Sequence, residues 1–261
     1  MTEENLLDEE ASILKDAETR FRDLPQASED IAERSLALLR EERELFDQAM
    51  VFQLAIARWV ANSARITDDG LRAAISIACY TFNMLLRGWE SLIRGFYAVA
   101  LNPVRNIEQA TITEQAVMLD PIIARKFLRN ELEDGEASQA LQRALAKENS
   151  DYAEEWGRWR RRVRNLEHEL THLRPTAVAP LILIADDEQS MMPIVGGFFN
   201  ERRCQRIGRS YAYLAFKAAV ESSQALKTVL PSDGKLKQQL DKLKEWGKPL
   251  IDSWEKEMGL I

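Results

Sequence analysis

The chain has 261 residues, of which 46% are hydrophobic and 30% are charged, and its formal net charge is −7 at pH 7. This balance is typical of a globular protein with a sizeable core, and it excludes an intrinsically disordered chain. The negative charge excludes a surface that is basic throughout, so we expect no broad nucleic-acid-binding surface.

Cysteine content and hydropathy indicate a cytoplasmic protein. The two cysteines, Cys79 and Cys204, imply no disulfide framework and fit a reducing compartment. The acidic N-terminal stretch MTEENLLDEE lacks the basic and apolar regions of a signal peptide. The longest uncharged apolar run, PTAVAPLILIA, is too short to span a bilayer, so we expect no association with a membrane.

Helical periodicity dominates the chain, and strand signals are almost absent. In chain order, the expected helices cover residues 5–23, 28–64, 70–101, 104–118, 121–130, 135–148, 151–173, 198–230 and a last helix that ends near residue 257. We expect Pro25 to break the chain and Ser28 to cap the second helix. Residues 175–185 are expected to form a short buried helix or an extended segment, and residues 186–197 form the most loop-like stretch.

These elements predict an all-α protein, a single large antiparallel helical bundle of about eight helices. The 70–101 helix is apolar on nearly all sides, so we expect it at the centre of the core. We expect an acidic N-terminal helix over residues 1–26 and a bundle core over residues 27–231. A C-terminal helix over residues 232–261 is expected to pack on the bundle or to extend from it. Binding of a protein partner or self-association is expected, the latter through the helices at either end.

Three charged residues of the 70–101 helix, Arg87, Glu90 and Arg94, follow one another at helical spacings of three and four. Charged side chains deep in a core must pair, because a buried unpaired charge is strongly destabilising. We therefore predict a structural ion network here, in preference to an active site.

The only two histidines, His168 and His172, lie four residues apart in the expected 151–173 helix, opposite its apolar stripe. The string HELTH, residues 168–172, resembles the HExxH motif of thermolysin-like zinc peptidases. This resemblance implies zinc as a cofactor, with His168 and His172 as ligands and Glu169 as the general base. It also implies a later glutamate as the third ligand, and Glu201 in the pair Asn200-Glu201 matches that role, although it follows His172 at a longer distance than in that family.

A second interpretation involves an arginine on the same helix. Arg161 and His168, with six residues between them, resemble the arginine–histidine pair of HEPN-class helical ribonucleases, which dimerise. This resemblance implies RNA as a partner and chemistry without a metal. His168 would act as acid or base at the ribose 2′-hydroxyl, and Arg161 would stabilise the transition state.

In a third interpretation this helix has no catalytic role. A helix face rich in arginine and histidine is also typical of a solvent-exposed surface or of an interface with salt bridges. The strings NMLLRGWESLIRGFYAVALNP and THLRPTAV resemble a loose group of bacterial all-helical proteins of unknown function, over residues 70–210. We therefore expect an intracellular helical interaction or regulatory protein with one polar site at His168 and His172. A zinc-dependent hydrolase is the alternative, and a ribonuclease is the second alternative.

Overall fold

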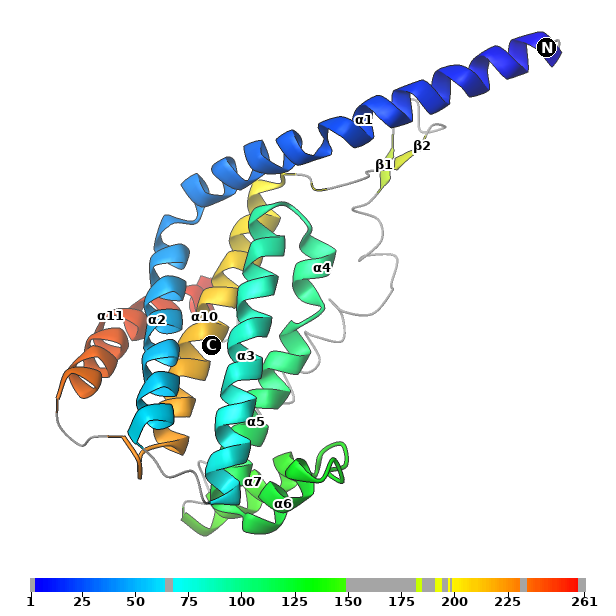
Figure 1. Cartoon of the computed structure of the whole chain (residues 1–261). Coiled ribbons are helices and arrows are strands. Elements are labelled where there is room, and N and C mark those ends of the chain that lie inside the picture. The colour runs from blue at the N-terminus through cyan, green and yellow to red at the C-terminus, as the bar shows by residue number, and fades with distance from the viewer. Residues whose placement is uncertain are drawn as a thin grey trace.

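The computed structural model of the chain describes residues 3–63, 68–148, 182–184, 191–193, 197, 199–230 and 234–257. Its helices are α1 (Glu3–Leu38), α2 (Arg40–Ser63), α3 (Asp69–Ile93), α4 (Tyr97–Leu101), α5 (Val104–Leu119), α6 (Pro121–Leu128), α7 (Glu136–Glu148), α10 (Glu201–Ala225) and α11 (Lys235–Glu257). The prediction of an all-α helical bundle of about eight helices is confirmed (Figure 1). None of the described helices combines the length and the hydropathy that a membrane span needs.

Helices α3 and α10 together form the centre of the bundle. Helix α10 packs against α2, α3 and α5, and α11 lies on the outer side of α2 (Figure 1). Small side chains on α10 allow this close approach, because alanine brings the helix axes nearer than leucine would. The buried alanines of α10 are Ala212, Ala215, Ala218 and Ala219. Between α2 and α3, the rings of Phe46 and Trp89 stack with their centroids 4.5 Å apart. Helix α3 also packs against α5 and α6, so the segment that we expected at the centre of the core shares that position with α10.

The N-terminal helix differs from the prediction. Helix α1 continues through Pro25, and the chain bends instead near Leu39, where α2 begins (Figure 1). A proline inside a helix removes one backbone hydrogen bond, and here the remaining bonds on either side keep the helix continuous. The expected boundary after residue 26 therefore falls inside α1. Ser35 is the buried residue of α1 among those whose burial the structure describes, so this helix meets the bundle near its C-terminal end.

The expected 70–101 helix is divided into α3 and α4. Gly95 has a φ of 78°, which is a left-handed conformation that glycine adopts without a steric penalty. The Phe96 N–H donates to the carbonyl of Ser91, and the Gly95 N–H donates to that of Leu92, which is the pattern of a glycine-terminated helix. The chain turns here and places α4 beside α3.

Two short strands were not predicted. Strand β1 (Ile182–Ile184) pairs in antiparallel register with β2 (Met191–Pro193), with Leu183 opposite Met192. The first lies in the stretch that we expected to be a buried helix or extended, and the second lies in the loop-like stretch. Each strand has three residues, which is too short to show the alternating pattern by which strands are recognised in a sequence.

Candidate binding site

Most residues of the zinc and ribonuclease interpretations lie outside the described residues. Those outside are Arg161, His168, Glu169 and His172. Glu201 is described: it is exposed and is the first residue of α10, directly after the helix cap at Asn200. No group of three histidine, cysteine, aspartate or glutamate side chains that could hold a metal ion lies within the described ranges. Both interpretations therefore stay predictions.

The three charged residues of α3 lie on the open side of that helix. Arg87, Glu90 and Arg94 are exposed, whereas Leu85 and Leu92 occupy its buried side. Deep burial, on which the prediction of an ion network depended, is therefore not observed. Within the described part of the chain, no ion pair joins these three residues, and Arg94 Nη1 lies 3.5 Å from the hydroxyl of Ser28.

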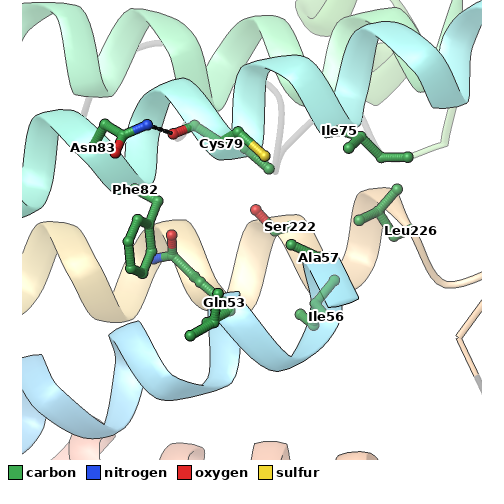
Figure 2. A pocket seen from close by; sticks show the side chains of 11 residues that line it. Gln53, Ile56, Ala57, Ile75, Cys79, Phe82, Asn83, Ser222 and Leu226 are labelled. Atoms are coloured by element: carbon green, nitrogen blue, oxygen red, sulfur yellow. Dashed lines mark hydrogen bonds between the residues drawn. The ribbon is translucent and has the colours of Figure 1, made fainter. Parts of the chain in front are cut away.

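A groove lies between α2 and α3, and its floor is α10 (Figure 2). It encloses a cavity of about 120 Å³. Most of its lining is apolar: Ile56, Ala57, Ile75, Ala78, Phe82 and Leu226. The groove exists because α2 and α3 both pack on α10 more extensively than on each other. The cavity is therefore a consequence of how the three helices are arranged.

The rim of the groove is open to solvent. Leu54 on α2 is 42% exposed, and Cys79 and Asn83 on α3 are also exposed. The side-chain amide of Asn83 donates to the carbonyl of Cys79 at 2.9 Å (Figure 2). On the opposite side, the amide of Gln53 donates to the carbonyl of Ala215 at 3.2 Å. These bonds fix both amide groups on the groove wall.

The floor of the groove carries a hydroxyl group that is backed by a buried carboxyl group. Ser222 of α10 lines the cavity, and its Oγ lies 2.8 Å from Oε2 of Glu114 on α5. Glu114 is completely buried, and its Oε1 has no hydrogen-bond partner among the residues that the structure describes. The pKa of Glu114 is raised to about 8, mainly by burial and also by the nearby charge of Glu221, while the Ser222 hydrogen bond opposes the rise. The carboxyl group is therefore neutral near pH 7.

A second carboxyl group lies beside this pair on α10. Gln115 donates from its side-chain amide to Oε2 of Glu221. Burial raises the pKa of Glu221, and the charges of Lys217 and Lys244 lower it. Polar side chains of α5 and α10 thus meet where these two helices pack together, and of Glu114, Gln115, Glu221 and Ser222 only Ser222 lines the cavity.

The sequence pattern of α5 contained a signal for Glu114. Ile107, Thr111 and Glu114 follow one another at spacings of four and three, and all three are buried. This spacing places Glu114 on the same helical stripe as an isoleucine, where a carboxyl group is unusual. Ser222 carried no such signal, because serine is common on both buried and exposed helix faces.

The groove can enclose a small apolar molecule and offer it one hydrogen bond from the floor. It is bounded by rigid helices, so its shape does not depend on loop closure. Comparison of the chain with protein-family models, with curated proteins and with solved structures found no match.

Proposed function

We propose that the protein is a helical binding protein with an interaction or regulatory role, and that the groove between α2 and α3 is a ligand site in the described part of the chain. The observation that carries this proposal is the apolar cavity of about 120 Å³ with an open rim. An engineered apolar cavity of about 150 Å³ is enough to bind benzene. A molecule of similar size, or an apolar side chain of a partner, fits this groove.

The chemistry of the floor favours binding over hydrolysis. A serine becomes a nucleophile when an adjacent base takes its proton. Here the adjacent group is Glu114, which already holds a proton near pH 7 because burial raises its pKa to about 8. A neutral carboxylic acid is not a base, so the Ser222–Glu114 pair supports a hydrogen-bonding role.

The proposal also includes a cytoplasmic location and a protein partner or a second copy of the chain. The zinc-dependent hydrolase and the ribonuclease, which are the two alternative functions, are tested separately. Zinc analysis of the untagged protein and of its His168→Ala variant tests the hydrolase, and an RNA cleavage assay on Arg161→Ala tests the ribonuclease. One zinc per chain that is lost in the first variant, or RNA cleavage that is lost in the second, would move the functional site to the expected 151–173 helix.

Ligand-observed NMR with benzene and toluene tests the groove. We expect saturation transfer from the wild-type protein to these ligands. Ala78→Leu places a larger side chain in the cavity and should abolish the transfer. Ala61→Leu is the matched control, because Ala61 is exposed on α2 and lies outside the groove lining, and it should leave the transfer unchanged. Absence of transfer to the wild type, or equal transfer to the Ala78→Leu variant, would contradict the proposal.

A further inference from the structure

We infer that the groove selects molecules that combine a small apolar body with one hydrogen-bond acceptor oxygen, which the hydroxyl group of Ser222 binds by donating its proton. This inference rests on the proposed function, because it requires the groove to be a binding site. It adds the chemical class of the ligand.

Few polar groups line the groove, and they differ in their position and in their hydrogen bonds. Among the described residues that line the cavity, Ser222 carries the only hydroxyl group. Asn83 and Gln53 line it from α3 and α2, and one N–H of each amide donates to a backbone carbonyl, whereas Ser222 lines it from α10. In Figure 2 the Ser222 hydroxyl points from α10 into the space between α2 and α3. It is therefore the polar group that a buried ligand meets at the floor.

The partner of Ser222 decides whether this hydroxyl donates or accepts. An ionised Glu114 could only accept, so Ser222 would have to give it the hydroxyl proton. The neutral carboxyl group of Glu114 carries a proton of its own, which is bound either to Oε2 or to Oε1. Oε1 is buried and has no partner in the described part of the chain. A buried O–H or N–H group without an acceptor is rarer in proteins than a buried carbonyl oxygen that lacks a donor. The proton therefore belongs on Oε2, from which Glu114 donates to Ser222.

This arrangement leaves the Ser222 hydroxyl proton available to the groove. A hydroxyl group can accept one hydrogen bond and donate another at the same time. Glu114, Ser222 and the ligand oxygen then form a chain of hydrogen bonds, and each bond in such a chain polarises the next. A ligand without an acceptor oxygen leaves this proton unpaired in an apolar cavity, which is unfavourable.

Two ligands of the same shape separate this inference from the proposed function. Cyclopentanone and methylenecyclopentane have the same number of non-hydrogen atoms and differ in that the first has a carbonyl oxygen. After correction for transfer from water, we expect the wild-type protein to bind cyclopentanone about 3- to 10-fold more tightly than methylenecyclopentane, measured by NMR titration at about pH 6, which is the range that one net hydrogen bond gives. Their transfer free energies from water, measured separately, correct the comparison for the greater hydrophobicity of the alkene.

Two variants complete the test. Ser222→Ala should remove the preference for the ketone while the alkene still binds. Ser223→Ala is the matched control, because Ser223 is also buried on α10 but donates to the carbonyl of Val220 and does not line the groove.

The outcomes are distinct. If both ligands bind the wild type without a preference for the ketone, the inference is wrong and the proposed function stands. If neither ligand binds, and benzene and toluene also fail, the proposed function is wrong. The wild-type comparison needs no variant, so poor folding of Ser222→Ala would not leave the inference untested.

Discussion

Glu114 makes the stability of the protein depend on pH. Burial raises the pKa of this carboxyl group from 4.5 to about 8, so between these values the folded chain binds more protons than the unfolded chain. Stability therefore falls as pH rises through this window, since ionising the buried group in the folded state is unfavourable. The loss between pH 5 and pH 8 is on the order of 3 kcal/mol, at about 1.4 kcal/mol per pKa unit.

Glu114→Gln should remove this part of the pH dependence. We expect a flatter profile of the free energy of unfolding between pH 5 and pH 8 than in the wild type, measured by urea denaturation. Glu90→Gln is the control: Glu90 is exposed on α3, and its replacement should leave the wild-type profile in place. Equal slopes for the wild type and Glu114→Gln would show that Glu114 is not the group responsible.

Gly88 of α3 lies directly against the side chain of Tyr211 on α10. A Cβ atom built on Gly88 would overlap the phenol ring and hydroxyl of Tyr211, which donates to the carbonyl of Ala100. We expect Gly88→Ala to destabilise the protein by about 1–3 kcal/mol, as overpacking of a tight core does. Ser76→Ala, an exposed change on the same helix, should stay within about 0.5 kcal/mol. A Gly88→Ala protein with a wild-type melting temperature would mean that α3 and α10 do not pack in this way.

At the scale of elements, Arg209 joins three helices. Its guanidinium pairs with Glu42 of α2 at 3.3 Å and with Glu257 of α11, and it lies 5.9 Å from the ring centre of Trp254. Burial raises the pKa of Glu42, and the pairing with Arg209 opposes that rise. Removing Arg209 leaves Glu42, which is 4% exposed, without its counter-ion.

We therefore expect Arg209→Gln to destabilise the protein by roughly 3 kcal/mol, because a buried charge loses its partner. Hydrogen exchange in α11 should also increase more than in α3. The double variant Glu42→Gln with Arg209→Gln should recover part of the loss, since it leaves no buried charge unpaired. A double variant as unstable as the single one would indicate that packing on Trp254, and not the ion pair, holds α11 in place.

The continuity of α1 gives a test at Ser28. In the sequence prediction Ser28 is a helix cap, and loss of a capping serine costs about 1 kcal/mol. In the structure it lies inside α1, where alanine is the better helix former. We expect Ser28→Ala to change the free energy of unfolding by less than about 0.5 kcal/mol. The contrary result would be a loss of about 1 kcal/mol in the free energy of unfolding, together with hydrogen exchange of the amides before Pro25 at the rates of an unfolded chain. It would show that the helix is interrupted at Pro25.

Helices whose ends carry a clear capping or proline signal in the sequence were predicted with nearly correct boundaries. Helix α6 begins at Pro121 as expected, and Asp120 caps it by accepting from the Ile122 N–H at 2.9 Å. Helices α5 and α7 were also located to within a residue or two. The division at Gly95 was missed because the apolar pattern continues across it. The continuation through Pro25 was missed because proline is a strong breaker in isolation and tertiary context decides the outcome.

At the scale of the whole molecule, the bundle could be predicted and the groove could not. Helical periodicity gives the faces that must be buried, and this is enough for the fold class. A groove depends on which helices lie next to each other and how far apart two of them stand, and segments far apart in the sequence determine that. Glu114 and Ser222 are separated by more than a hundred residues along the chain and meet only because α5 and α10 pack together.

The central claim is that the groove between α2 and α3 binds a small apolar molecule, and Cys79 gives the most direct test. The chain has two cysteines: Cys79 is exposed at the groove rim, and Cys204 is completely buried. An aromatic disulfide reagent should therefore modify Cys79 rapidly, and Cys79→Ser should abolish this fast phase. We predict that toluene slows the reaction of the wild type in a saturable manner and has no effect on the Ala78→Leu variant. A rate that toluene leaves unchanged in the wild type would contradict the claim.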